Sequence, residues 1–199
     1  MLRRAREFVR PKDEAVTATY RVSAGELEPD HWTHDLAEGG GRLLGEGCHF
    51  VDALAYLAGS PVESVFCAAR GSGDTPLQAR DDAAIVLTFQ NGSVGSLVYS
   101  AEGSPRLAKE RVEVFSGPRS AVLDDYRSLQ LHGANGKQEL AERTQDKGHA
   151  AEIAAFLEGI ARGEPPVSLQ EVYNVSAASL AVVESLRTGL PVRLARNPD

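Results

Sequence analysis

Apolar residues recur along the chain at two different spacings, and these spacings separate predicted strands from predicted helices. Positions 15–22 alternate between apolar and polar residues and are rich in β-branched side chains, which is typical of a strand. Asn91-Gly92 lies between two alternating runs and predicts a β-hairpin, because both positions of a two-residue turn favour a positive φ. Further strands are predicted at 62–69, 83–89, 93–100, 111–115, 120–123 and 128–131.

Helical spacing marks the start of the chain and a segment just beyond its first long loop. Positions 1–10 are basic and helix-like but have no N-cap, so we interpret them as the end of a helix that began upstream. Positions 43–57 predict another helix, which ends at Gly59 and Pro61. Positions 25–41 form a connecting loop of a length that often carries function.

Two helices are predicted in the last third of the chain. The first carries an apolar stripe with the spacing i, i+3, i+4 and i+7 and ends near Gly163. The second begins at Ser168, where Glu171 completes a capping box, and ends at Gly189. With strands in the middle and helices toward one face, the chain is predicted to be a single α+β domain with a large, mostly antiparallel open sheet. The stripe consists of Ile153, Phe156, Leu157 and Ile160.

Charge and cysteine content argue against several classes of function. The net charge is −7 with acidic and basic residues interspersed, unlike a nucleic-acid-binding surface. No apolar run approaches the roughly 20 residues of a membrane-spanning helix, and the N-terminus has no apolar signal core. Cys48 and Cys67 form no CxxC pair, and the spacing of His31 and His34 is not that of a zinc site. We therefore predict a cytoplasmic protein that binds no nucleic acid, membrane or metal.

The segment GGGRLLGEGCHFVD, positions 39–52, contains the candidate chemistry. Its glycines allow the backbone to turn tightly, and the helix that follows carries four polar residues at spacings of three and four: Glu46, His49, Asp52 and Tyr56. These spacings place them on roughly one helical face, and a histidine beside carboxylates is what a general base for an alcohol proton needs. The alternative is that His49 is a structural residue and Asp52 is merely solvated.

No nucleotide-binding or hydrolase motif accompanies this helix. In a GxGxxG fingerprint the third glycine would follow Gly39 and Gly41 at the position of Leu44, and the segment follows a loop where the fingerprint needs a strand. A P-loop and a GxSxG elbow are also absent. A second polar cluster, QDKGH, places Lys147 and His149 at a helix start, where free N–H groups favour anions; the alternative is a solvated helix end.

These features together make the sequence similar to one oxidoreductase family over nearly its whole length. The similarity rests on Trp32 and Asp35, on GGGRLLGEGCHFVDALAYLAG, on the hairpin LTFQNGSVGSLVYSAEG and on the ending ESLRTGLPV. In these the chain resembles the C-terminal domain of the Gfo/Idh/MocA oxidoreductases (glucose-fructose oxidoreductase, inositol dehydrogenase and relatives). GEGCHFVD together with QDKGHAAE is most similar to members fused behind an alcohol-dehydrogenase-like module.

The resemblance implies a two-domain enzyme that transfers hydride between NAD or NADP and a small polyhydroxylated substrate, such as a sugar or cyclitol. A Rossmann domain of the same protein, absent here, would bind the cofactor and supply a lysine. This chain would be the substrate-binding and oligomerisation domain, with a fold like the C-terminal domain of glyceraldehyde-3-phosphate dehydrogenase. His49 would be the acid/base, Glu46 the nearest carboxylate, and Asp52 a contact to a substrate hydroxyl.

The resemblance also implies how the rest of the chain is used. Tyr99, Trp32, His34 and Lys147 would line the substrate pocket, and the exposed face of the sheet would form homo-oligomers. Positions 1–12 would be the remnant of the helix that links the Rossmann domain, and positions 13–199 the substrate domain. On its own the chain is expected to be inactive.

One position departs from the family pattern. The family places an aspartate four residues before the histidine, and here that position is Gly45. Glu46 is one residue along, which turns its side chain by about 100° around a helix. This departure supports an alternative, in which the domain is a non-catalytic scaffold or ligand sensor that kept the fold and lost the chemistry.

Overall fold

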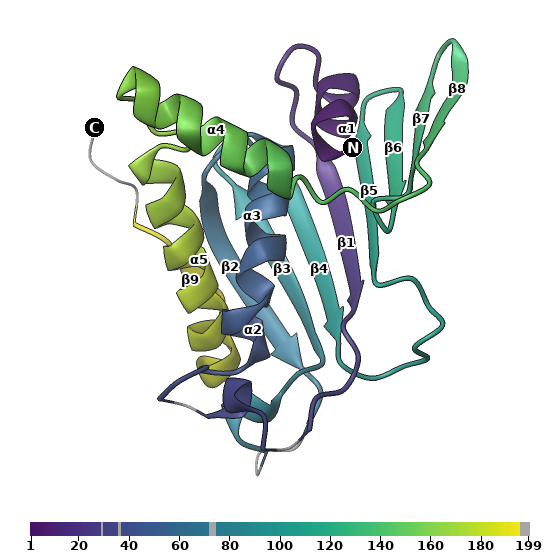
Figure 1. Ribbon diagram of the computed structural model, residues 1–199. Helices are drawn as coiled ribbons and strands as arrows, with labels where there is room; N and C mark the ends of the chain where they lie inside the picture. Colours follow the sequence, from purple (N-terminus) through teal and green to yellow (C-terminus); the bar gives the residue numbers. More distant parts are fainter. Residues whose placement is uncertain (29, 36, 72–74, 196–199) are drawn as a thin grey trace.

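In the described part of the chain, nine strands form one open sheet in the order β8-β7-β6-β5-β1-β4-β3-β2-β9, and the helices cover one of its faces (Figure 1). The computed structural model describes residues 1–28, 30–35, 37–71 and 75–195, so positions 29 and 36 of the long loop and the end of the predicted substrate domain lie outside the described residues. The strands are β1 (Thr17–Ser23), β2 (Val62–Ala69), β3 (Ala83–Phe89), β4 (Val94–Ser100), β5 (Glu110–Ser116), β6 (Arg119–Asp124), β7 (Ser128–Gly133), β8 (Gly136–Ala141) and β9 (Val192–Arg193).

Neighbouring strands run antiparallel except β1 and β4, which pair in parallel with Thr17 opposite Val94. The predicted α+β class with a mostly antiparallel sheet is thereby confirmed. The sequence signal missed β8, in which five of six positions are exposed, because a strand without a buried face has no apolar alternation. It also missed β9, which is two residues long.

The helices lie on one face of this sheet. Helix α3 packs against β1, β4 and α5, helix α5 lies along β2, and α1 lies across β5, β6 and β7. Asn174 fastens α5 to the sheet, because its side-chain amide accepts a hydrogen bond from the Val62 N–H at 2.8 Å. The helices are α1 (Leu2–Val9), η1 (Trp32–His34), α2 (Arg42–Gly45), α3 (Gly47–Ala58), η2 (Leu77–Ala79), α4 (His149–Arg162) and α5 (Leu169–Thr188).

The hairpin predicted at Asn91-Gly92 is present between β3 and β4, but its turn differs from the expected one. Gly92 has φ 83°, whereas Asn91 is not in the left-handed region. The Gly92 N–H donates to the Phe89 carbonyl at 3.0 Å, and the Asn91 side chain accepts from the Ser93 N–H at 3.1 Å. The asparagine therefore stabilises the turn through its side chain, as in an Asx turn, and one positive φ is enough.

The core lies between the sheet and the helices. Apolar side chains from alternate positions of β1, β3 and β4 meet the inner face of α3, and Leu54 and Leu57 are fully buried there. Each such side chain contributes about 1.5–3 kcal/mol by burial. Of the helices that the structure describes, none combines the length and apolar character needed to cross a bilayer.

Helix α4 has the predicted extent but not a buried apolar face. Its stripe of Ile153, Phe156, Leu157 and Ile160 is 57–64% exposed, and no residue of α4 is buried. Helix α5 has the predicted capping box at Ser168 and Glu171. The apolar stripe of α4 therefore does not contribute to the core of this chain.

Candidate functional site

His49, Asp52 and Tyr56 lie on one exposed face of α3, as their spacing predicted. They line a cavity of about 570 Å³, which is also bordered by α1, by the α4–α5 connection with the first half of α5, and by Tyr126 of the β6–β7 turn. The guanidinium of Arg6 stacks on the Tyr56 ring at 4.6 Å and closes one side. The cavity thus combines an imidazole, a carboxyl group and aromatic walls.

Asp52 is in an unusual setting for a residue on an exposed helix face. Partial desolvation by its neighbours raises the pKa of its carboxyl group, and the nearby His49 charge opposes this rise while Glu171 adds to it. A carboxyl group one turn beyond a histidine can orient the imidazole or accept a hydrogen bond from a substrate hydroxyl.

Glu46 belongs to a different cluster. It lies at the break between α2 and α3, where it interrupts the continuous helix predicted for 43–57, and it is not among the residues that line the His49 cavity. Its carboxylate accepts hydrogen bonds from Lys109 at 2.6 Å, from Arg42 at 3.1 Å and from the Tyr99 hydroxyl. Burial alone would raise the pKa of Glu46, but these bonds and the Lys109 charge outweigh it and lower the pKa to about 2.

The Glu46 cluster connects three separate parts of the chain. Tyr99 comes from β4 and is fully buried, so it does not line the His49 cavity; burial and its bond to Glu46 raise the pKa of its hydroxyl. Lys109 comes from the loop before β5, and the buried Arg42 also donates to the Gly25 carbonyl at 2.5 Å. Glu46 therefore holds the start of α3 to the sheet and to this loop.

A second buried network lies beside the His49 cavity. Glu110, at the start of β5, accepts hydrogen bonds from Lys147 at 2.5 Å and from the Tyr20 hydroxyl at 2.5 Å. The Tyr20 and Tyr126 hydroxyl oxygens lie 3.2 Å apart, and Tyr126 lines the cavity. Lys147, predicted as a substrate contact, is therefore paired with Glu110. It does not line the His49 cavity itself, whereas Tyr126 does.

Trp32 and His34 are not brought to this cavity. Trp32 is 58% exposed on η1, and His34 lies 3.0 Å from Asp81, which fastens the long loop to the segment before β3. His31 caps η1 by accepting a hydrogen bond from the Thr33 N–H at 3.3 Å. No three His, Cys, Asp or Glu side chains are grouped as metal ligands among the described residues.

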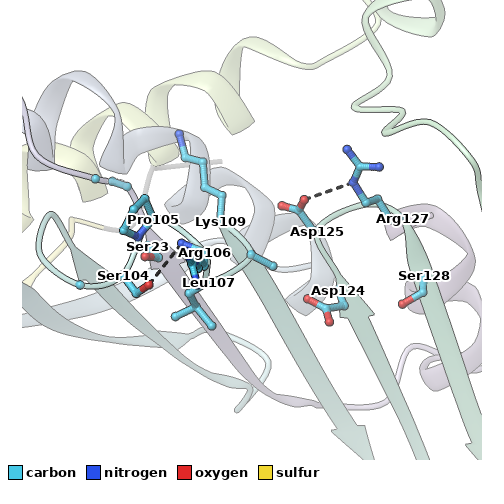
Figure 2. A pocket seen from close by; sticks show the side chains of 14 residues that line it. Ser23, Ser104, Pro105, Arg106, Leu107, Lys109, Asp124, Asp125, Arg127 and Ser128 are labelled. Carbon is cyan, nitrogen blue, oxygen red and sulfur yellow. Dashed lines mark hydrogen bonds and ion pairs between the residues drawn. The ribbon is translucent and has the colours of Figure 1, made fainter.

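Figure 2 shows a second hollow, of about 670 Å³, beside the end of β1 and the β6–β7 turn. One wall is the loop before β5, with Arg106 and Lys109, and the other is the β6–β7 turn, with Asp125 and Arg127. Arg127 pairs with Asp125 at 3.5 Å, and Lys109 extends away from this turn toward Glu46. Lys109 and Arg127 therefore have charged partners within the protein, whereas the Asp125 Oδ1 atom is buried without a hydrogen-bond partner among the described residues.

The three glycines before α2 allow a close backbone approach at Gly39 and positive φ angles at Gly40 and Gly41. A Cβ on Gly39 would lie 2.4 Å from the Thr33 Cα, so this glycine lets η1 lie directly against the loop. Gly41, with φ 92°, begins α2 after a loop and not after a strand. Among the described residues, the glycine segment therefore lacks the strand–turn–helix arrangement of a dinucleotide fingerprint.

Sequence reasoning missed Lys109, Glu110 and Tyr126. Lys109 and Glu110 lie in a charged run, KER, which is also typical of a solvated strand end. Tyr126 lies between the strands predicted at 120–123 and 128–131, and nothing in a connecting segment indicates that its aromatic residue lines a cavity. Only the pairing of β1 with β5, which lie about ninety positions apart in the chain, brings Tyr20 to Glu110.

The profile of one family, the GFO/IDH/MocA C-terminal domain, matches residues 14–137. A search of curated proteins found no match. Among solved structures, an oxidoreductase domain protein from Kribbella flavida has a TM-score of 0.80 at 18% identity, covering 98% of this chain and 63% of that one. A levoglucosan dehydrogenase in complex with NADH and levoglucosan has a TM-score of 0.78 at 21% identity, covering 96% and 62%.

An aldose-aldose oxidoreductase from Caulobacter crescentus, complexed with glycerol, has a TM-score of 0.76 at 19% identity, covering 97% of this chain and 60% of that one. At these identities the likeness concerns the fold. The chain spans about three fifths of the length of these solved chains.

Proposed function

We propose that this chain, which belongs to the GFO/IDH/MocA C-terminal domain family, is the substrate-binding half of a two-domain oxidoreductase that acts on a sugar, cyclitol or related polyhydroxylated compound. The observation that carries the proposal is the cavity in which His49, Asp52 and Tyr56 lie together at the outer face of α3. Solved relatives of the same fold include a levoglucosan dehydrogenase and an aldose-aldose oxidoreductase, which support a carbohydrate-like substrate.

His49 would exchange the proton of the substrate hydroxyl. Imidazole is the side chain that gives and takes protons most readily near neutral pH, and His49 is exposed to the cavity and not packed in the core. Asp52 would orient the imidazole or accept a hydrogen bond from a neighbouring substrate hydroxyl. Glu46, whose carboxylate accepts three hydrogen bonds and has a low pKa, would position the start of α3 and would not carry the proton itself.

The hydride acceptor would be NAD or NADP, bound by a Rossmann domain that this chain does not supply. The stripe on α4 would be the surface that contacts this domain, because it is apolar and exposed, and because the α4–α5 connection that follows it lines the His49 cavity. The chain alone is therefore expected neither to bind NADH nor to turn over. Calorimetry with NADH on the 199-residue chain checks this expectation.

The outer face of the sheet would form the homo-oligomer. Phe66 and Val86 are paired across β2 and β3 and are 37% and 41% exposed on the face without helices, and Val98 lies on the same face. Apolar side chains that recur on neighbouring strands form a continuous surface, which favours association. Sedimentation of a Phe66→Lys, Val86→Lys variant should show a smaller species than the unmodified chain.

The activity test uses a polypeptide that carries both domains and follows nicotinamide absorbance with a panel of sugars and cyclitols. His49→Ala should lower kcat by about 100- to 10,000-fold with unchanged folding. His149→Ala, at the exposed start of α4, is the matched control and should leave turnover unchanged. Unchanged turnover in His49→Ala would contradict the assignment.

The family aspartate that is missing at Gly45 favours a second candidate, a non-catalytic scaffold or ligand sensor. The backbone at Gly45 accepts a Cβ, which would meet only the Gly39 carbonyl at 3.6 Å and the Thr33 methyl at 3.8 Å, both ordinary contacts. Gly45→Asp therefore separates the two candidates. The scaffold is favoured if the unmodified protein binds a polyol without turnover and Gly45→Asp gains turnover. Turnover by the unmodified enzyme would favour catalysis.

A further inference from the structure

The turn between β6 and β7 is built in a conformation that its sequence does not favour. The Arg127 N–H donates to the Asp124 carbonyl at 2.9 Å, and the two central residues, Asp125 and Tyr126, have φ 50° and 54°. Positive φ at both central positions is usual for Asn-Gly, and aspartate tolerates it. For a bulky residue such as tyrosine it is a rare and strained conformation.

The strained turn places consecutive side chains into different spaces. Asp125 and Arg127 line the hollow shown in Figure 2, whereas Tyr126 between them lines the cavity with His49 and Asp52. A glycine at position 126 would remove the strain but would leave the cavity without this wall. Strain that persists beside a cavity is typical of positions where the side chain has a function.

The hydrogen bonds behind Tyr126 have a defined direction. The Lys147 ammonium and the Tyr20 hydroxyl both donate to the Glu110 carboxylate. A tyrosine hydroxyl has one proton, so the Tyr20 oxygen is left to accept the hydrogen bond from Tyr126, 3.2 Å away. The proton of Tyr126 is then committed to Tyr20, and its oxygen lone pair remains as an acceptor for a group in the cavity.

We propose that Tyr126 is a substrate-binding and specificity-determining residue, whose hydroxyl oxygen accepts a hydrogen bond from a substrate hydroxyl that is not the one oxidised. The inference rests on the proposed function, which puts a polyhydroxylated compound into this cavity. It names a chemical requirement: the position of the substrate that faces Tyr126 must carry a donor. A deoxy or carbonyl group at that position is rejected, because neither donates a hydrogen bond.

The first experiment compares Tyr126→Phe with the unmodified protein, using levoglucosan and myo-inositol as probes. Tyr126→Phe keeps the ring and the turn and removes the hydroxyl, so KM and the dissociation constant should rise about five- to tenfold while kcat changes little. Loss of the hydrogen bond to Tyr20 should also lower Tm slightly. Tyr173→Phe is the matched control, because this tyrosine is exposed on α5 and does not line the cavity. An unchanged KM in Tyr126→Phe overturns the inference, since a merely structural tyrosine would alter Tm and not KM.

The second experiment tests the direction of the hydrogen bond with monodeoxy and monofluoro derivatives of myo-inositol. At one ring position, both derivatives should bind the unmodified protein several-fold more weakly than myo-inositol does. The Tyr126→Phe variant should bind both derivatives and myo-inositol with equal affinity. If the fluoro derivative, which cannot donate, binds as well as myo-inositol at every position, Tyr126 is not an acceptor and the proposal fails. Tyr20→Phe frees the Tyr126 proton, and in this variant the discrimination against the fluoro derivative should shrink.

Failure of this inference is distinguishable from failure of the proposed function. Binding of a probe to the 199-residue chain that weakens in Tyr126→Phe, with no turnover in the two-domain polypeptide, supports the Tyr126 contact and contradicts the oxidoreductase. Turnover with a KM that does not change in Tyr126→Phe supports the oxidoreductase and contradicts the Tyr126 contact. Neither binding nor turnover with any probe contradicts both.

Discussion

Removal of the Glu46 charge tests the cluster that holds the start of α3. Glu46 is 27% exposed and accepts hydrogen bonds from Lys109, Arg42 and Tyr99, and Arg42 itself is only 4% exposed in its side chain. Lowering the pKa of Glu46 from 4.5 to about 2 corresponds to about 3 kcal/mol of stabilisation of the folded protein. Glu46→Gln keeps the shape and removes the charge, so we expect a loss of about 3 kcal/mol near neutral pH. For a chain of this size that lowers Tm by about 6–12 °C.

The pH dependence gives an independent measurement of the same quantity. Because the folded pKa of Glu46 is depressed, its contribution is fully present above the unfolded pKa of about 4.5 and is lost as the pH falls toward about 2. Unfolding by urea at a series of pH values should show this acid loss in the unmodified chain and a flatter profile in Glu46→Gln. Glu184→Gln, which removes an exposed pair with Arg187, is the control and should leave Tm nearly unchanged. Equal acid loss in both proteins, or an unchanged Tm in Glu46→Gln, would refute the reasoning.

Three further predictions concern packing and are checked by urea or thermal unfolding. Leu54→Ala, at a fully buried position, should cost about 3 kcal/mol through lost burial and the cavity left behind; a loss below about 1 kcal/mol would mean that the site collapses to fill it. Gly39→Ala should cost about 1–3 kcal/mol because its Cβ would meet the Thr33 backbone, whereas Gly47→Ala, with 3.8 Å to its nearest neighbour, should be neutral or stabilising. Phe156→Asp should leave the stability of the chain within about 0.5 kcal/mol, because α4 contributes nothing to the core.

Much of the fold was predictable from the sequence, because strands with one buried face and helices with clear caps carry local signals. β3 was predicted with its observed bounds, and the capping box at Ser168 and the stop at Gly189 bound α5 as expected. β8 was not predictable, since its exposed positions need no alternation. The parallel pairing of β1 with β4 could not be predicted from the sequence either. The register between distant strands depends on the whole sheet and not on the sequence of either strand.

The candidate site was predictable only where its residues lie on one element. His49, Asp52 and Tyr56 share a face because helical spacing is a local property, and the structure places them on one cavity. Glu46 lies three residues before His49 and would share this face in a continuous helix. However, α2 ends at Gly45 and α3 begins at Gly47. That break turns the Glu46 carboxylate toward Lys109, and no spacing rule for a continuous helix describes it.

The placement of charges suggests why the two clusters are separate. Glu46 lies beside Lys109 and Arg42 and has its pKa lowered to about 2, so its carboxylate is ionised near neutral pH and is poorly suited to carry a proton there. Asp52 has the opposite environment, in which desolvation raises its pKa, and it is the carboxyl group that shares the cavity with His49. One carboxylate therefore stabilises the helix start permanently, while the other remains responsive to its surroundings. The three donors to Glu46 leave its carboxylate little capacity to accept from a substrate, whereas the Asp52 carboxyl group faces the cavity.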